Sequence, residues 1–167
     1  MRYLTSLLIL LSILIPSSSF ADKEAAVDFT LEDVDGGLFS LKEHLGSGPV
    51  LNDFWATWCK PCKDAMPYLQ KLHEKYSEQG LTLIAISTDS PRSQSKVKPF
   101  IRSRHYTFKV LLDPNSEVLK QLQGRNLPFQ VIIDKDGRVV ESHTGYSPGD
   151  EKILEEKIKG MLLQDEQ

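Results

Sequence analysis

The only two cysteines of this chain, Cys59 and Cys62, lie between a segment with strand character and a segment with helical spacing. The run from Val50 to Trp55 is almost continuously apolar, as in a buried central strand. From residue 62 to residue 78 the apolar residues recur at helical spacing. This order places a dithiol at a helix N-terminus, where unpaired N–H groups and the helix dipole favour a thiolate. Because a thiolate is the form that attacks disulfides, the pattern predicts redox chemistry at Cys59.

Length and composition indicate one globular domain. The chain has 167 residues, of which 40% are hydrophobic and 26% charged, and this is enough for one sizeable core in an ordinary soluble protein. The net charge of −3 gives no reason to expect a nucleic-acid partner. We expect a monomer that needs no cofactor.

Residues 1–21 have the features of a secretory signal peptide. Arg2 supplies a positive start, residues 3–15 are almost entirely apolar, and Ser19-Phe20-Ala21 has small residues at the two positions that signal peptidase reads. The apolar run is short compared with the roughly 20 residues that span a membrane, which favours cleavage after Ala21 over a membrane anchor. The expected mature domain, residues 22–167, would act in a bacterial periplasm, where a cysteine pair is better explained as a working couple than as a structural staple.

The rest of the chain alternates between strand and helix patterns. Hairpins are predicted around Asp35-Gly36-Gly37 and around Lys135-Asp136-Gly137. Between them we expect strands at 81–87 and 108–112 and helices at 97–104 and up to residue 122. The expected terminal helix, 150–163, has an apolar side formed by Ile153, Leu154, Ile158, Met161 and Leu162. This order predicts an α/β fold with a mixed central sheet and helices on both faces.

The residues around the cysteines resemble the active-site signature of the thioredoxin superfamily. The matching segment is Trp55-Ala56-Thr57-Trp58-Cys59-Lys60-Pro61-Cys62. Pro67 and the later Leu127-Pro128-Phe129 match the kink proline and the cis-proline of that superfamily. The N-terminal hairpin and an insert at 88–106, after the second central strand, look like the extracytoplasmic TlpA/ResA-like branch. The resemblance covers about residues 27–163 and implies a thioredoxin-like fold.

The resemblance also implies a thiol–disulfide oxidoreductase. Cys59 would be the attacking, more exposed thiolate, which forms a mixed disulfide with a partner, and Cys62 the buried thiol that resolves it. Lys60 adds a positive charge beside Cys59 and favours its thiolate. Pro61 fixes the first turn of the helix at a position whose N–H would lack a partner.

Four further residues are expected to form the partner groove. Pro128, in a cis peptide bond, would face the dithiol, and the backbone beside it would pair with a bound peptide like a strand. Leu127 and Phe129 flank this proline, and Trp58 is the candidate for direct contact with partners. Phe129-Gln130 stands where the superfamily often has threonine after the proline, a departure that bears on the choice of partner.

Asp53 is the most informative residue outside the motif. This branch usually has asparagine there, whereas thioredoxins have a buried aspartate. Burial raises the pKa of a carboxyl group, so we expect Asp53 to serve as general base for Cys62. The alternative is an ordinary polar residue whose hydrogen bonds come from backbone groups at a strand end. Some members of the branch have an acidic residue in the insert, near the active site, and either Asp89 or Ser90 could align with it. A solvated loop carboxylate is an equally good interpretation of Asp89.

The alternatives to an oxidoreductase are a metal-binding module, a peroxidase of related fold and a holdase. A zinc or copper module needs more ligands than the cysteine pair, since a closed zinc site takes about four. The histidines, none at adjacent ligand spacing, are His44, His73, His105 and His143. A peroxidase of related fold would have threonine and proline where this chain has Ala56 and Asn52. Nothing in the sequence indicates the large apolar surface of a holdase.

The direction of electron flow is open at this point. Resemblance to the TlpA/ResA-like branch favours reduction of disulfides in secreted proteins, such as apocytochrome c before haem attachment. The electrons would come from a membrane thiol carrier. A periplasmic thiol oxidant is the alternative, because the reduction potential depends on more than the two residues between the cysteines.

Overall fold

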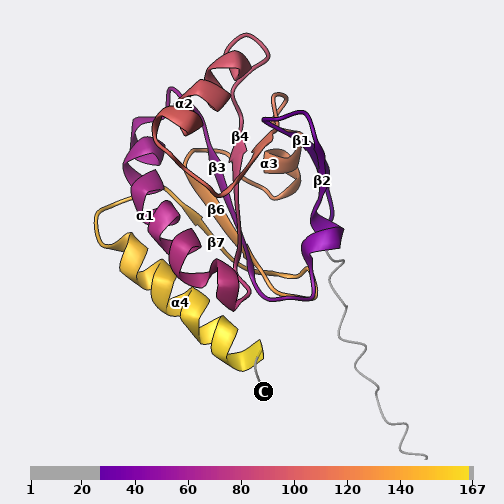
Figure 1. Cartoon of the computed structure of the whole chain (residues 1–167), viewed down its shortest axis with the longest axis vertical. Helices are drawn as coiled ribbons and strands as arrows, with labels where there is room; N and C mark the ends of the chain where they lie inside the picture. Colours follow the sequence, from indigo (N-terminus) through magenta and orange to yellow (C-terminus); the bar gives the residue numbers. More distant parts are fainter. Residues whose placement is uncertain (1–26, 166–167) are drawn as a thin grey trace, which may run out of the picture.

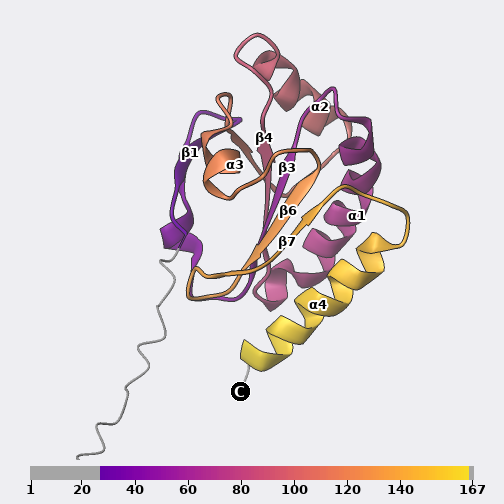
Figure 2. The same ribbon diagram turned by 180° about the vertical axis from the view of Figure 1, so that it is seen from behind.

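The computed structural model describes residues 27–165, which contain one mixed seven-stranded sheet in the order β2-β1-β5-β4-β3-β6-β7 (Figures 1 and 2). Strands β3, β4 and β5 run parallel, and β1, β6 and β7 each run antiparallel to their neighbours. The strands are β1 (Thr30–Asp33), β2 (Leu38–Ser40), β3 (Val50–Trp55), β4 (Thr82–Ser87), β5 (Lys109–Leu112), β6 (Phe129–Ile133) and β7 (Val139–Thr144). The mixed sheet and both hairpins are confirmed. The expected signal peptide, 1–21, lies outside the described residues.

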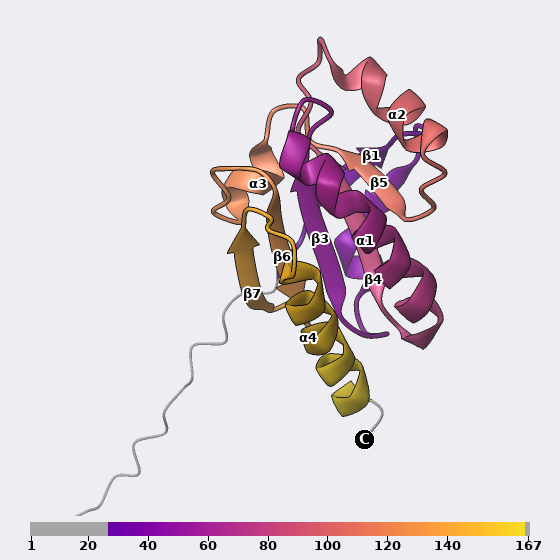
Figure 3. The same cartoon turned by 90° about the vertical axis from the view of Figure 1, so that its left-hand side faces the viewer.

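Helices cover both faces of this sheet, as expected (Figure 3). They are α1 (Lys60–Tyr76), α2 (Val97–Ser103), α3 (Glu117–Gln121) and α4 (Asp150–Asp165), with short 3-10 turns at Leu41–His44, Ser77–Gln79 and Gln94–Lys96. Apolar residues of α1, α2 and α4 share one core cluster, and those of α3 and the turn Leu41–His44 share the other. Within residues 27–165, no helix is both long and apolar enough to cross a bilayer.

Strand β3 is the centre of the molecule, and all six of its residues are buried. Successive side chains of a strand point to opposite faces. Leu51 and Trp55 belong to the core cluster of α1 and α4, whereas Val50 and Phe54 belong to that of α3. The alternation therefore places Asp53 on the α1 and α4 face.

One prediction about α4 is wrong. Ile158 and Leu162 are buried and Leu154 is half-buried, but Ile153 is 66% exposed. At 3.6 residues per turn, Ile153 lies about 140° around the helix axis from Ile158. The buried stripe of α4 is narrower than the apolar pattern of its sequence.

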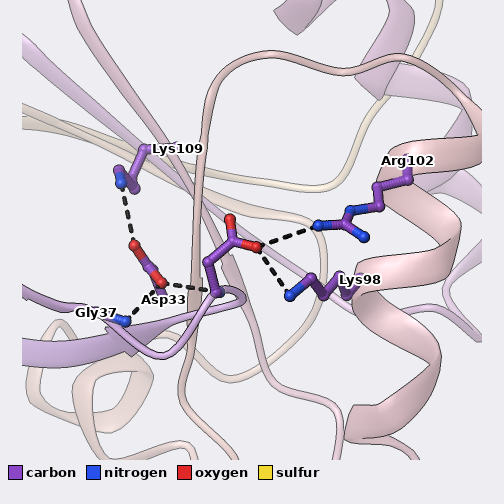
Figure 4. A network of polar contacts seen from close by, with 6 residues as sticks. Asp33, Gly37, Lys98, Arg102 and Lys109 are labelled. Carbon is purple, nitrogen blue, oxygen red and sulfur yellow. Dashed lines mark hydrogen bonds and ion pairs between the residues drawn. The ribbon is translucent and has the colours of Figure 1, made fainter.

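Ion pairs join the N-terminal hairpin to the insert between β4 and β5 (Figure 4). Asp35, in the hairpin turn, contacts Lys98 at 2.8 Å and Arg102 at 3.4 Å, both in α2. Asp33 accepts a hydrogen bond from Lys109 of β5 at 3.1 Å. Because the Asp35 pairs are exposed to solvent, they contribute little to stability, but they link α2 to the hairpin.

Helix α2 reaches the strand that leads to the cysteines. The ring of Phe100 in α2 packs against Trp55, the last residue of β3, with ring centroids 5.4 Å apart. Trp55 itself is completely buried. The insert thus contributes part of the wall behind the expected site.

Candidate active site

The two cysteines lie at the N-terminus of α1. Cys59 is the N-cap of this helix and Cys62 lies in its first turn. They form a disulfide with their Cα atoms 5.4 Å apart. Cys59 Sγ accepts a hydrogen bond from the backbone N–H of Cys62 at 3.3 Å, which is the bond that an N-cap side chain normally accepts. A negatively charged sulfur would accept it more strongly, so this site favours a thiolate at Cys59.

Access to the two sulfurs differs in the expected sense. Cys62 is completely buried, whereas Cys59 is 5% exposed. The neighbouring Trp58 is 68% exposed and forms a large apolar surface beside Cys59. Of the two cysteines, Cys59 is thus the more exposed residue in the disulfide form.

Lys60 and Pro61 occupy the first turn of α1 and are both exposed. The Lys60 ammonium group does not act on Cys59 alone, because it forms an ion pair with Asp64 one turn along the helix, at 2.7 Å. Its charge is therefore shared between Asp64 and the surroundings of Cys59.

The Leu127–Pro128 peptide bond is cis, as expected. Phe54 of β3 and Phe129 of β6 are register partners in an antiparallel pair. Pro128, the residue before Phe129, therefore lies near the end of β3 that leads to the cysteines. Leu127 is half-buried. Phe129 is 4% exposed and its ring lies 6.0 Å from that of Phe54. The Phe129 side chain therefore belongs to the core, which leaves only its backbone for the expected groove.

Asp53 is completely buried. Its Oδ1 accepts a hydrogen bond from Gln130 Nε2 at 2.9 Å, and its Oδ2 has no partner among the described residues. Burial raises the pKa of Asp53 to about 7, against a smaller opposing effect of the Gln130 hydrogen bond. The alternative of a polar residue satisfied by backbone groups is wrong, because this bond comes from a side chain.

Asp89 anchors the loop that precedes the cysteines. Its carboxylate accepts hydrogen bonds from the Thr57 N–H at 2.7 Å, the Thr57 hydroxyl at 2.6 Å and the Ser87 hydroxyl at 3.0 Å. Asp89 is 1% exposed, so the interpretation as a solvated loop carboxylate is wrong. Ser90 bonds with Ser93 instead.

Thr57 was missed as a functional residue by the sequence reasoning. A signal for it existed, since Thr57 follows β3 and Asp89 follows the adjacent parallel strand β4. The carboxyl ends of parallel strands meet at one edge of a sheet. That edge is where the cysteines lie, so Asp89 and Thr57 belong to the support of the site.

The described part of the chain contains no group of three or more His, Cys, Asp or Glu side chains placed to hold a metal ion. His73 is half-buried in α1, and its ring lies edge-on to Phe108 with centroids 6.4 Å apart. Among the described residues, the cysteine pair therefore has no histidine beside it in the arrangement of a zinc or copper site.

Comparison with known proteins agrees with this chemistry. Residues 23–142 match the model of the AhpC/TSA family. The thiol-disulfide oxidoreductase ResA of Bacillus cereus is 39% identical over 149 residues, which cover 86% of this chain and 81% of the relative. The protein of the same name from Halalkalibacterium halodurans is 36% identical over 135 residues, covering 77% and 75%.

Two solved structures show the same fold. A thiol:disulfide interchange protein from a Bacteroides species superposes with a TM-score of 0.69 at 25% identity, covering 83% of this chain and 88% of its own. The exposed lipoprotein thioredoxin of Streptococcus pneumoniae gives 0.68 at 26% identity, covering 80% and 99%. With its paired Cys59 and Cys62 at a helix N-terminus, the chain belongs to the AhpC/TSA family and is a ResA-like thiol-disulfide oxidoreductase.

Proposed function

We propose that this oxidoreductase works as a reductant of disulfide bonds in secreted proteins. The observation that carries the proposal is the difference between the two cysteines: Cys59 caps the helix and is 5% exposed, and Cys62 lies one turn inside and is completely buried. The Cys59 thiolate attacks one sulfur of the partner disulfide, forming a mixed disulfide, and the other partner sulfur leaves as a thiolate. Cys62 then attacks Cys59 Sγ. The second partner sulfur leaves reduced, and the Cys59–Cys62 disulfide remains.

Asp53 serves as the proton acceptor for Cys62 in this proposal. A thiol must lose its proton before it attacks a disulfide. Because burial brings the pKa of Asp53 to about 7, a large fraction of this carboxyl is ionised near neutral pH and able to accept a proton. Asp53 lies on the face of β3 that α1 covers, the same side as Cys62.

The partners of this reaction are extended segments of secreted proteins. Trp58 offers an exposed apolar surface, and the backbone around the cis bond of Pro128 offers strand-like pairing to a bound peptide. Lys60, Pro61 and Leu127 complete the rim. Apocytochrome c before haem attachment is a suitable substrate, with a membrane thiol carrier as the electron donor.

The place of action is the periplasm, and the working form is a monomer. Residues 1–21 act as a signal peptide that is cleaved after Ala21, leaving residues 22–167 as the mature domain. The structurally similar thioredoxin of Streptococcus pneumoniae is an exposed lipoprotein, which agrees with an extracytoplasmic site of action for the fold.

The test is reduction of a disulfide-bonded protein, with insulin as the probe, by the pre-reduced enzyme. Cys59→Ser is expected to abolish turnover, and Cys62→Ser to accumulate a mixed disulfide with insulin that a non-reducing gel detects. A Cys59→Ser protein that reduces insulin at the normal rate refutes the proposal.

The direction of electron flow is tested by the reduction potential of the Cys59/Cys62 couple against glutathione. A value near about −270 mV supports a reductant, and one near about −120 mV supports the alternative of a thiol oxidant. Consumption of hydrogen peroxide by the reduced protein, measured alongside, distinguishes a peroxidase of related fold.

A further inference from the structure

Asp53, Gln130 and His143 lie in register across three neighbouring strands. Asp53 on β3 pairs with Gln130 on β6, and Gln130 pairs with His143 on β7. Paired residues of neighbouring strands point to the same face of a sheet, so the three side chains share the face that α1 and α4 cover. The exposed fraction rises along the row, from none at Asp53 to 9% at Gln130 and 51% of the His143 side chain. A polar row thus leads from the core to the surface.

Gln130 is the one side chain within the described chain that bonds to the Asp53 carboxyl. On the other side of β3, the residue in register with Asp53 is Ala85 of β4, which has no polar side-chain atom. The second carboxyl oxygen, Oδ2, has no partner among the residues described. The position of this carboxyl therefore depends on a single amide, whose hydrogen bond also opposes the effect of burial on its pKa.

Gln130 also lines a pocket between β6, β7 and α4, with a volume of about 90 Å³. A cavity of this size holds a few water molecules. Its walls include Ile132 and Leu154, but Asp53 is not among the residues that line it. The Gln130 side chain therefore stands between the buried carboxyl and this pocket.

The charged groups that face Gln130 from β7 and α4 are paired with one another. His143 Nε2 lies 3.6 Å from Asp150 Oδ2, and Lys157 forms an ion pair with Glu141. Neither pair bonds to Asp53.

On the side of α1, Gln130 faces a smaller cavity whose titratable wall residues are Tyr68, Tyr146, Glu151 and Asp150. Tyr146 remains neutral at physiological pH, because burial and the nearby Glu151 carboxylate raise the pKa of its hydroxyl to about 12. Glu151 accepts hydrogen bonds from the Gly149 N–H and the Tyr146 hydroxyl. None of these groups bonds to Asp53.

We propose that Gln130 is the positioning residue of Asp53: its amide holds one carboxyl oxygen, and its side chain seals the carboxyl from water in the pocket between β7 and α4. The inference rests on the proposed role of Asp53 as proton acceptor for Cys62. Gln130 then affects the pKa of Asp53 in two separable ways, because a hydrogen bond to a carboxylate favours the charged form and exclusion of water disfavours it.

Two substitutions at this one position separate the effects. Gln130→Met keeps the length and the seal but removes the amide, so the pKa of Asp53 rises by about one unit. Gln130→Ala also removes the amide, but it opens the carboxyl to the pocket. Because desolvation is the larger of the two effects on this carboxyl, we expect solvation by water to outweigh the lost hydrogen bond, so the pKa of Asp53 falls. A residue that only fills space would not move the same carboxyl in opposite directions.

The experiment is a carbon-13 NMR titration of the Asp53 carboxyl in the disulfide form, in which neither cysteine titrates. In parallel, the pH dependence of insulin reduction is measured with the same variants. For Gln130→Met we expect about fivefold slower reduction at pH 7, because the ionised fraction of Asp53 falls from about one half to about one eleventh, and recovery about one pH unit higher. For Gln130→Ala we expect the increase of the reduction rate with pH to occur at lower pH.

Ile132→Val is the matched control. Ile132 lies on the same strand and the same face, lines the same pocket and makes no bond to Asp53. It is expected to leave the titration of Asp53 unchanged. If Gln130→Ala does not fold, as judged by circular dichroism, Gln130→Ser takes its place as the variant that opens the pocket.

The outcomes distinguish this inference from the proposed function. Shifts of the Asp53 titration in opposite directions support the inference, and shifts in one direction, or none, overturn it. If the titration shifts as expected but the rate profile does not, Gln130 positions Asp53 and Asp53 is not the proton acceptor. If Asp53→Asn abolishes the pH dependence of insulin reduction while the Gln130 variants leave the titration of Asp53 unchanged, the proposed function stands without a role for Gln130.

Discussion

The Asp89 carboxylate holds Thr57 by two hydrogen bonds, one from the Thr57 backbone N–H at 2.7 Å and one from its hydroxyl at 2.6 Å. Thr57 lies between the end of β3 and the Cys59 N-cap. The bonds therefore tie the loop that carries the attacking sulfur to the end of β4. A buried carboxylate with its acceptor positions filled by local donors is a strong anchor.

Asp89→Ala is expected to destabilise the protein by about 1–3 kcal/mol, because it leaves the Thr57 N–H and the Ser87 hydroxyl without their partner. Urea unfolding of the disulfide form measures this. The same variant should slow insulin reduction, since the loop before Cys59 loses its anchor. Ser90→Ala, which removes a neighbouring hydroxyl with no bond to Asp89, is the control, and equal effects of the two substitutions would contradict the anchor.

The burial of Asp53 makes stability depend on pH in a defined direction. The pKa of Asp53 is raised by burial from 3.8 to about 7, so between these values the folded protein binds more protons than the unfolded chain. The free energy of unfolding therefore falls as pH rises through this window, by up to about 1.4 kcal/mol per pH unit. Asp53→Asn should flatten this slope, because the amide does not titrate.

Urea unfolding at pH 5 and pH 8, in the disulfide form, measures that slope. His73 acts in the opposite sense, because burial lowers the pKa of its ring, and it contributes stability that grows with pH. The difference between the wild-type and Asp53→Asn slopes removes this contribution. Identical slopes for the two proteins would show that Asp53 is ionised to the same extent in the folded and the unfolded state.

The ion pair between Lys60 and Asp64, at 2.7 Å, predicts a gain of thiolate at Cys59 when the partner is neutralised. Asp64→Asn frees the Lys60 ammonium group one residue after Cys59 and removes a nearby negative charge. The thiolate absorbance of the reduced protein should then develop at lower pH, by less than one unit, since both side chains are exposed. Lys60→Gln should move it the other way, and a shift of the same sign in both variants would contradict this account.

Asn52 is completely buried, and neither its side-chain oxygen nor its side-chain nitrogen has a hydrogen-bond partner within the described chain. Its register partners, Ile84 and Val131, are buried and apolar. Asn52→Val should therefore raise the free energy of unfolding by about 1–2 kcal/mol, because an unsatisfied amide is costly in such surroundings. Thermal and urea unfolding check this, and a loss of stability would indicate that the amide is satisfied in solution.

Much of the fold follows from local patterns that the structure confirms. The apolar run of β3, the cysteine pair and the helical spacing that follows are adjacent in the chain, so their order alone predicts a dithiol at the start of α1. The turn residues of the two hairpins act over a few positions and are equally readable. The terminal helix was predicted with its bounds nearly right, but the exposure of Ile153 was not, because burial depends on what packs against each side.

The same distinction between local patterns and long-range contacts applies to the residues of the site. The strand, the helix and the place of the cysteines between them could be predicted from the residues alone, because each depends on the conformational preferences of chain neighbours. The contacts of Gln130 with Asp53, 77 residues apart, and of Asp89 with Thr57, 32 residues apart, could not be predicted in this way. These pairs arise from the strand order and register of the sheet, and periodicity along one segment does not encode which other segment lies beside it.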